Sequence, residues 1–268
     1  MKYIFYLLCI IFLAGCENPD TFAVDFTKKE SISFAEYVIP YSFFPRTLQL
    51  VGIGDSLTKG VGDELKKEGY IGRVKTELFQ FKGIEDVVLT NTALRGRRSD
   101  QLLKLLNNGD FDYAIRNADI MMITIGGNDL MKIVKKDLFN LKVESFEKGL
   151  ISFENNYIKI IDRIRKINSN AKIVLIGLYN PLSIVSEDSS EFDTIINEWN
   201  ATIENIANDD ENACFVPIET LFDTNGNLVY HTDFFHPNSK GYQLMSESIM
   251  NSLIDCGFID DKDWELLF

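Results

Sequence analysis

The chain has 268 residues, of which 46% are hydrophobic and 25% charged, and these values are typical of a folded protein with room for one domain and leader segments. The formal net charge is −13. This excess of acidic residues argues against nucleic-acid binding, which needs a Lys/Arg-rich surface, and against electrostatic attachment to an anionic membrane.

The N-terminus has the pattern of an export signal. Lys2 precedes an apolar run at 3–13, which is too short to span a bilayer comfortably. The run leads into Leu-Ala-Gly-Cys, ending at Cys16, which resembles a bacterial lipobox. This resemblance implies that residues 1–15 are a signal peptide and that lipidated Cys16 anchors the chain to the outer face of the cell membrane. An ordinary cleaved signal with an incidental cysteine is the alternative.

The remaining cysteines leave two possibilities open. Cys9 is expected to leave with the signal peptide and Cys16 to carry lipid, so that Cys214 and Cys256 stay in the mature chain. In an exported protein these two residues can form a disulfide. Two buried free thiols fit the sequence equally well, because the pairing geometry cannot be derived from the spacing alone.

A segment without sustained periodicity follows the signal. We interpret residues 16–46 as the lipidated N-terminus and a tether that ends in an edge segment at 37–46. The pattern changes near Leu48, and the folded domain is therefore assigned to 47–268.

Apolar runs of strand length recur in this domain. Most are continuous rather than alternating, as in strands of a parallel sheet that is covered on both faces. The runs lie at 48–53, 86–91, 119–125, 172–178 and 214–218.

Helical patterns lie between these runs. In the clearest, at 144–167, apolar residues recur at steps of four and three and form a single stripe. The alternation of strands and helices predicts a doubly wound α/β sandwich. Further helices are expected at 70–82, 99–107, 191–208 and 239–254.

Small and polar residues follow the first three strands. They are Gly54-Asp55-Ser56, the segment 91–96, and Gly126-Gly127-Asn128-Asp129. Because ligands bind at the carboxyl ends of strands in such folds, we expect these segments to line a cleft.

Ser56 has a candidate base and a candidate orienting acid. A serine is a poor nucleophile until a base takes its proton. His236 and Asp233 lie three residues apart, so one loop can present both, with Asp233 holding the histidine towards Ser56 as in a catalytic triad. Activity should then rise with loss of the His236 proton, near neutrality or a little above. His231, the other histidine, is interpreted as a packing or surface residue.

Three groups can stabilise the oxyanion of acyl transfer. They are the backbone N–H of Ser56, the backbone N–H of Gly96 in ALRGRRS, and the side-chain amide of Asn128 in GGND. Each follows a different predicted strand.

Four segments together resemble the SGNH/GDSL hydrolase superfamily. They are GDSLT around Ser56, the block with Gly96, GGND with Asn128, and DFFHPN with Asp233 and His236, and they occur in the order of that family. The resemblance implies a flavodoxin-like three-layer α/β/α fold with a parallel five-stranded sheet. It also implies ester hydrolysis through an acyl-enzyme, with Ser56 as nucleophile, His236 as base, Asp233 as its partner and no metal or cofactor. The lipobox and the wording around Ser56 are most similar to lipoprotein lipases and acylhydrolases of Gram-positive bacteria.

Neighbouring residues suggest how a substrate is held. Arg95, Arg97 and Arg98 flank Gly96 in a chain that is otherwise acidic, which suggests a site for an anionic group; solvated charges paired with local acids are the alternative. Apolar residues after Asn128 and beside His236 are candidates for an acyl pocket, although core packing explains them equally well. They are Leu130, Met131, Ile133, Val134, Phe234 and Phe235.

The sequence therefore predicts a membrane-anchored, extracytoplasmic serine esterase. Its expected partners are a small ester or lipid substrate, with lysophospholipid-like acyl esters first, and the membrane through Cys16. The alternatives are an O-acetylesterase acting on cell-wall carbohydrate and, from another class, a non-catalytic lipoprotein that binds an envelope ligand. The sequence sets no oligomeric state.

Overall fold

The computed structural model describes residues 39–136, 142–181, 190–225 and 228–268. The expected signal peptide, Cys16 and most of the expected tether lie outside these residues. Residues 40–268 form one compact unit. Within the described residues, no helix is both long and apolar enough to cross a membrane.

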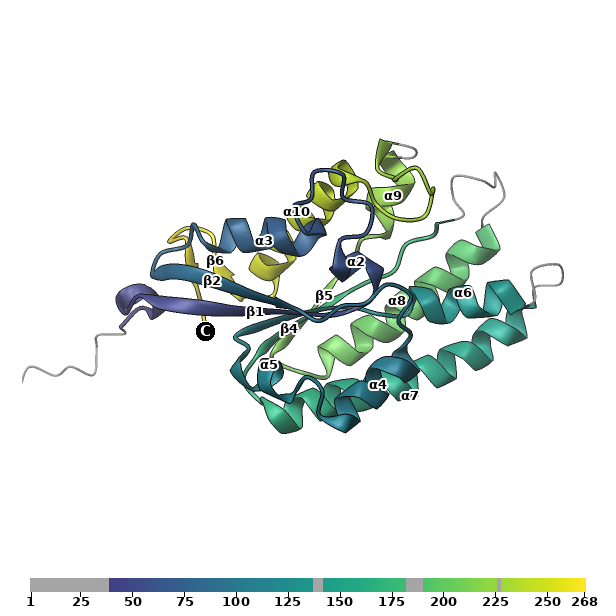
Figure 1. Ribbon diagram of the computed structural model, residues 1–268, viewed down its shortest axis with the longest axis horizontal. Coiled ribbons are helices and arrows are strands. Elements are labelled where there is room, and N and C mark those ends of the chain that lie inside the picture. The colour runs from purple at the N-terminus through teal and green to yellow at the C-terminus, as the bar shows by residue number, and fades with distance from the viewer. Residues whose placement is uncertain (1–38, 137–141, 182–189, 226–227) are drawn as a thin grey trace, which may run out of the picture. The chain divides into compact units, whose positions relative to one another are not determined.

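A parallel sheet of five strands forms the centre of the domain (Figure 1). Its strand order is β2-β1-β3-β4-β5, so that β1 lies between β2 and β3 and every described neighbour pair is parallel. The predicted three-layer α/β/α fold is confirmed. The strands are β1 (Arg46–Gly54), β2 (Ile84–Asn91), β3 (Ile120–Thr124), β4 (Lys172–Ile176) and β5 (Ala213–Val216).

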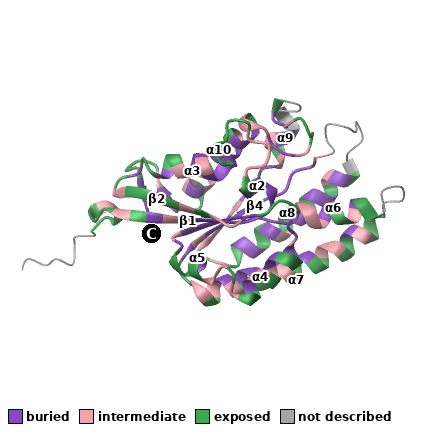
Figure 2. Cartoon of the chain, in the orientation of Figure 1, coloured by how far each residue is buried: buried purple, intermediate pink, exposed green. Residues whose placement is uncertain are grey.

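Helices cover both faces of the sheet, and two separate apolar cores result. Successive residues of a strand point to opposite faces, so Val51 and Ile53 join one core while Leu48 and Leu50 join the other. Figure 2 shows the buried residues concentrated in the strands and on the inward sides of the helices. One layer contains α4 (Ser99–Asn108), α5 (Asp112–Asn117), α6 (Gly127–Lys136), α7 (Val143–Ile167) and α8 (Ser190–Asn208). The other contains α2 (Ser56–Lys59), α3 (Gly69–Leu78), α9 (Glu219–Asn225) and α10 (Ser239–Asp255).

The long helix α7 packs through the stripe that its sequence predicts. Phe153, Tyr157, Ile160 and Ile164 are buried, and Phe153 stacks on Trp199 of α8 with ring centroids 4.7 Å apart. The stripe joins the two helices to the sheet because aromatic and branched apolar side chains fill the layer between them.

Helix α3 is shorter than predicted. It ends at Leu78, before the expected boundary at residue 82. Phe79 points outwards and Gly83 adopts a positive φ of 75°, so the chain turns here into β2. A Cβ on Gly83 would meet the backbone of Ser42. Ser42 lies within η2 (Tyr41–Phe43), a short 3-10 helix that precedes β1.

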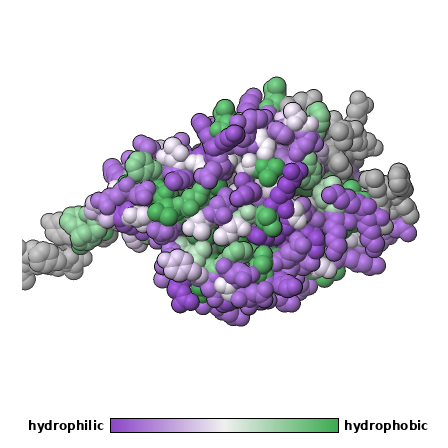
Figure 3. Space-filling model, viewed as in Figure 1, coloured by the Kyte–Doolittle hydropathy of each residue, from purple (hydrophilic) through white to green (hydrophobic). Residues whose placement is uncertain are grey.

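The C-terminal tail docks on the domain. It forms a short antiparallel pair, β6 (Ile259–Asp260) and β7 (Glu265–Leu266), and Trp264 stacks on Phe81. The surface view in Figure 3 is largely hydrophilic with separate hydrophobic patches, in keeping with the acidic composition.

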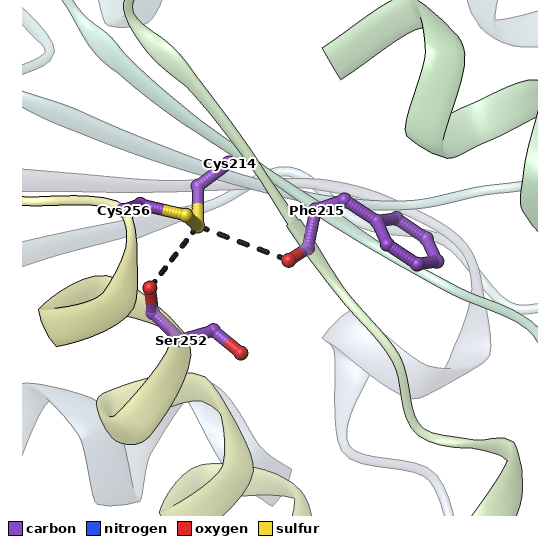
Figure 4. The surroundings of a disulfide bond; sticks show 4 residues. All are labelled: Cys214, Phe215, Ser252 and Cys256. Atoms are coloured by element: carbon purple, nitrogen blue, oxygen red, sulfur yellow. Dashed lines mark hydrogen bonds between the residues drawn. A yellow bond between two sulfur atoms is a disulfide. The ribbon is translucent and has the colours of Figure 1, made fainter. Parts of the chain in front are cut away.

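Cys214 and Cys256 form a disulfide, which decides between the two possibilities left open above. It joins β5 to the end of α10, with Cα atoms 5.9 Å apart (Figure 4). The Cys214 sulfur also lies 3.4 Å from the carbonyl oxygen of Ser252. A disulfide sulfur carries no hydrogen, so this approach is a packing contact rather than a hydrogen bond.

Replacing both cysteines by serine should destabilise the domain. The cross-link closes a loop with a sequence separation of 42 residues. By the chain-entropy relation, such a loop stabilises the folded state by about 4 kcal/mol, and its loss in a domain of this size lowers Tm by about 10 °C. Thermal unfolding of the wild type with and without reductant, beside the double variant, measures the effect. An unchanged Tm in both comparisons would contradict it.

Candidate active site

Ser56 lies where β1 leaves the sheet. Gly54, the last residue of β1, has φ +135° and runs so close to β3 that a Cβ would come within 2.0 Å of the Thr124 carbonyl oxygen. Only glycine fits this exit. Asp55 then caps α2 by accepting the Leu57 N–H at 3.1 Å, and Ser56 becomes the first residue of the helix.

Ser56, His236 and Asp233 form one hydrogen-bonded chain. The distance between Ser56 Oγ and His236 Nε2 is 2.9 Å, and that between His236 Nδ1 and Asp233 Oδ2 is 2.6 Å. The second oxygen of Asp233 accepts the backbone N–H groups of Phe235 and His236 at 3.1 and 2.9 Å. An ionised carboxylate assigns the proton to Nδ1, which leaves Nε2 free to accept the Ser56 proton.

Local contacts shift the pKa values of both triad partners. Burial raises the pKa of Asp233, but the hydrogen bonds from the backbone and ring of His236 outweigh it and set this pKa at about 2. Burial lowers the pKa of His236, and the positive charges of Arg95 and His231 lower it further. The hydrogen bond and the charge of Asp233 raise the pKa of His236, but by less than these other effects lower it. The pKa of His236 therefore lies below its ordinary value, whereas the sequence led us to expect neutrality or a little above.

This shift fixes the acid side of the pH profile. His236 is neutral above its pKa and accepts the serine proton only in that form. We therefore expect kcat/KM to rise with pH, and the midpoint of this rise to lie below pH 6.5. Asp233, with a pKa of about 2, stays ionised throughout. Initial rates between pH 4 and 9 measure the midpoint. His231→Gln should move the midpoint slightly upward, since the interaction with His231 lowers the pKa of His236. A wild-type midpoint above pH 7 would contradict the assignment.

Of the two other predicted oxyanion donors, Asn128 lines the same cavity as Ser56, and Gly96 lies in a loop that is tied to the end of β1 by the hydrogen bond from Leu94 N–H to the Gly54 carbonyl oxygen. Gly96 has φ +82°, and a Cβ there would meet open space, so backbone conformation rather than crowding favours glycine. Asn128, near the start of α6, donates one amide N–H to the Arg97 carbonyl oxygen at 3.1 Å. The N–H of Ser56 is the first of α2 and has no intrahelical acceptor.

A largely apolar cavity opens at Ser56. Ser56 and Asn128 both line it, and its other lining residues come mainly from the start of α6, the segment after β4, α8 and the His236 loop. Asp55 and Thr124 also line the cavity, and its other lining residues include Leu57, Leu130, Met131, Leu178, Tyr179, Pro181, Phe192, Ile196 and Phe235.

Comparison with known proteins identifies the family. A family model of the GDSL-like lipase/acylhydrolase family matches residues 53–244, a span that holds all four segments described above. The chain belongs to this family. As a GDSL hydrolase it is a carboxylic ester hydrolase, as the sequence predicted.

Individual relatives of this GDSL hydrolase agree with the assignment. It is 32% identical over 246 residues, 91% of the chain and 92% of the relative, to the uncharacterised protein YpmR of Bacillus subtilis. It is 26% identical over 210 residues to the spore germination lipase LipC of Bacillus licheniformis, covering 76% of this chain and 95% of LipC. The crystal structure of the lipase Lip_vut3 from a goat rumen metagenome superimposes with a TM-score of 0.69 at 26% identity, over 76% of this chain and 97% of Lip_vut3.

The three arginines around Gly96 lie in different environments. Arg97 is buried and donates to the carbonyl oxygens of Thr92 and Gly54 at 2.8 and 3.3 Å, so it braces the Gly96 loop against β1. Arg98 pairs with Asp100 at 3.0 Å. Arg95 is exposed and has no ion-pair partner among the described residues. The structure does not gather the three guanidinium groups into one anion site.

Several predicted pocket residues do line the cavity, and others do not. Leu130, Met131 and Phe235 form part of its wall. Val134 is buried in the core, and Phe234 is 56% exposed. The segment 177–181, which was not predicted to line the pocket, follows β4 and supplies Leu178, Tyr179 and Pro181. The rule that strand ends form the site could have found it, had it been applied to the fourth strand as well as to the first three.

A second buried acid, Asp55, lines the cavity as its segment was expected to, but the sequence indicated no specific role for it. It accepts the Thr124 hydroxyl at 2.7 Å, and Thr124 in turn contacts the Thr58 hydroxyl at 2.8 Å. Burial raises the pKa of Asp55 to about 6, against the lowering effect of these hydrogen bonds. Its neighbours fix the turn that carries Ser56.

Proposed function

We propose that this GDSL hydrolase is a membrane-anchored, extracytoplasmic serine esterase that cleaves acyl esters of lipid-like molecules. One observation carries the proposal: Ser56, which is hydrogen-bonded to His236 and through it to Asp233, lines a cavity whose wall is largely apolar. The chain supplies a nucleophile, and the cavity supplies a place for a hydrocarbon acyl group.

Acylation begins with proton transfer from Ser56 to His236. Ser56 Oγ attacks the ester carbonyl carbon while Nε2, 2.9 Å away, takes its proton. The carbonyl oxygen becomes an oxyanion, which accepts hydrogen bonds from the N–H groups of Ser56, Gly96 and the Asn128 side chain. The tetrahedral adduct collapses when His236 returns the proton to the leaving oxygen. The alcohol departs, and the acyl group stays on Ser56 as an ester.

Deacylation repeats these steps with water. His236 removes a proton from the water molecule, the resulting hydroxide attacks the acyl carbon, and the same donors hold the second oxyanion. Collapse returns the proton to Ser56 Oγ and releases a carboxylic acid. The ionised Asp233 keeps Nδ1 protonated through both halves and stabilises the imidazolium that forms in each.

The cavity favours an acyl group longer than acetyl. Its walls beyond the mouth are apolar side chains such as Leu130, Met131 and Phe192, which gain contact with each added methylene. Each buried methylene contributes about 0.8 kcal/mol, so several can add orders of magnitude to kcat/KM. An acetyl group would leave most of this surface unused.

Membrane anchoring through Cys16 is the second part of the proposal. It rests on the leader and lipobox-like sequence at 1–16. Cells grown with labelled palmitate should yield labelled wild-type protein in the membrane fraction. Cys16→Ala should carry no label. A labelled Cys16→Ala protein would overturn this part and leave the esterase assignment untouched.

Arg95 is proposed to favour esters with an anionic group. It is exposed, lies next to Gly96, and its charge is felt at His236. Arg95→Ala should raise KM several-fold for anionic esters and leave neutral esters unchanged, since an exposed charge pair contributes up to about 1 kcal/mol. Lys104→Ala, on the exposed side of α4, is the matched control. Equal changes in KM for both kinds of ester would exclude this role.

A covalent probe tests the nucleophile directly. A fluorophosphonate phosphonylates an activated serine: the serine oxygen bonds to phosphorus and fluoride leaves. It should therefore label Ser56 in the wild type, and mass analysis of peptides can locate the label. Ser56→Ala should not be labelled, and His236→Ala should react far more slowly. Labelling at another serine, or none in the folded wild type, would overturn the proposed mechanism.

A further inference from the structure

Gly96 and Asn128, two of the proposed oxyanion donors, belong to different segments, and hydrogen bonds join these segments. Gly96 lies in the loop before α4, and Asn128 lies at the start of α6. Asp129, next to Asn128, accepts two hydrogen bonds from Ser99, the first residue of α4. Its Oδ2 accepts the Ser99 backbone N–H at 3.0 Å, and its Oδ1 accepts the Ser99 hydroxyl at 2.6 Å.

Two more bonds complete this link. The Asn128 amide donates to the Arg97 carbonyl oxygen at 3.1 Å, so it too is held by the loop that carries Gly96. From α7, Asn156 donates to the Ser99 hydroxyl at 3.1 Å and keeps that hydroxyl directed at Asp129. Ser99 is fully buried, which protects these bonds from competition with water.

We propose that Asp129 and Ser99 are positioning residues that fix the spacing of the two oxyanion donors. This inference rests on the proposed function, because it assigns Gly96 and Asn128 to the oxyanion. Neither Asp129 nor Ser99 is proposed to contact the substrate. They act by joining the segment 96–99 to the segment 128–129.

The amide of Asn128 shows why such a link is needed. It has two N–H groups, and one is spent on the Arg97 carbonyl oxygen, which sets the rotation of the amide. The other is then available to the oxyanion. A shift of the loop relative to α6 would move Gly96 away and turn the Asn128 amide at the same time. Displacements of about 1 Å in such donors can cost about 100-fold in rate.

The chemistry of Asp129 fits this task. The first N–H groups of α4 have no intrahelical acceptor, and a carboxylate at that end of a helix is favoured by the helix dipole. Burial, together with the charge of Asp100, raises the pKa of Asp129, so its position is electrostatically unfavourable. An acceptor from α4 itself would cap that helix without this penalty. The acceptor comes from α6 instead, and this ties the two donor segments together.

Helix α6 separates this link from the acyl cavity. Leu130 and Met131 line the cavity, whereas Asp129 and Lys132 line a polar groove shared with α7. Breaking the link should therefore disturb the oxyanion donors and leave the acyl pocket in place. The loss in rate should be the same for short and long acyl chains.

The experiment compares Asp129→Ala, Ser99→Ala and the double variant with the full-length wild type. We expect kcat to fall about 10- to 100-fold with KM within about twofold, and the double variant to resemble Asp129→Ala because both changes break one link. Asp129→Asn keeps an acceptor for the Ser99 N–H and should recover part of the loss. Lys132→Ala, exposed on the same side of α6, should keep wild-type kcat.

A second readout separates positioning from general damage. A boronic acid forms a tetrahedral adduct on the serine and engages the oxyanion donors, whereas a carboxylic acid product occupies the pocket without the adduct. Asp129→Ala should weaken boronate inhibition by about the same factor as kcat, following transition-state binding, and leave product inhibition unchanged. Equal loss in both, with a lowered Tm, would show a merely structural role and overturn the proposal.

The failure of this inference differs from failure of the proposed function. An active wild type whose Asp129→Ala variant keeps full kcat overturns the link alone. A wild type with no esterase activity, matched by Ser56→Ala, overturns the proposed function and the link together.

Discussion

His236→Ala should lower kcat/KM by about 10³-fold or more, equivalent to about 4 kcal/mol of transition-state stabilisation. The ring bridges Ser56 at 2.9 Å and Asp233 at 2.6 Å, and no other described base contacts the Ser56 hydroxyl. Without it, Ser56 keeps its proton and the leaving alcohol receives none. Initial rates on a chromogenic ester measure the loss.

The matched control is His231→Ala. His231 is the only other histidine of the chain, and its ring lies 3.8 Å from the opposite oxygen of Asp233 without reaching Ser56. This variant should keep kcat within about threefold of the wild type, because it changes only a nearby charge. Comparable losses in the two variants would mean that His236 is not the specific base.

Asn128→Ala should lower kcat by about 10²- to 10³-fold, with a smaller effect on KM. Its amide is the only proposed oxyanion donor supplied by a side chain, and substitution removes this donor together with its hydrogen bond to the Arg97 carbonyl oxygen. The oxyanion exists only in the transition state and the intermediates, which is why the loss should fall on kcat.

Asn155→Ala provides the matched control for this change. Asn155 lies on α7, is exposed, and donates only to the Ile151 carbonyl oxygen of its own helix. It should keep wild-type kcat. A loss in Asn128→Ala confined to KM would contradict its role as an oxyanion donor and would instead indicate uniform substrate binding.

Much of the fold could be predicted because its strands are covered on both faces. Runs such as that at 172–178 read as continuous apolar segments, and the stripe of α7 has one unbroken period. Boundaries were less accurate where a turn ends an element without a change in hydrophobicity. At the end of α3, the apolar residues Phe79 and Phe81 continue the helical pattern while the backbone has already left the helix.

The base and acid of the triad could be proposed from sequence because histidine is rare in this chain and Asp233 lies close to His236. The chain has two histidines, and only His236 has an acid three residues before it in a motif of the family. The direction of the His236 pKa could not be predicted in this way. The shift depends on how deeply the ring is buried and on the charges of Arg95, which is distant in sequence, and His231, which is near in sequence.

The roles of other residues near the site depend on contacts between segments that are distant in sequence, and these roles could not be predicted. The arginines beside Gly96 look alike in sequence, yet Arg97 is buried against the carbonyl oxygens of Thr92 and Gly54 while Arg95 is exposed. The link from Asp129 to Ser99 spans 30 residues, and no local pattern indicates it. Such pairings become visible only when the strand ends are brought together.

The most direct test of the central claim is hydrolysis of nitrophenyl esters from acetate to palmitate by the wild type and by Ser56→Ala. We expect the wild type to prefer acyl chains longer than acetate, because the cavity at Ser56 is largely apolar, and we expect Ser56→Ala to lose about 10³-fold or more at every length. A sharp preference for acetate would favour the O-acetylesterase alternative. Equal rates for the two proteins on every ester would contradict the serine-esterase mechanism itself.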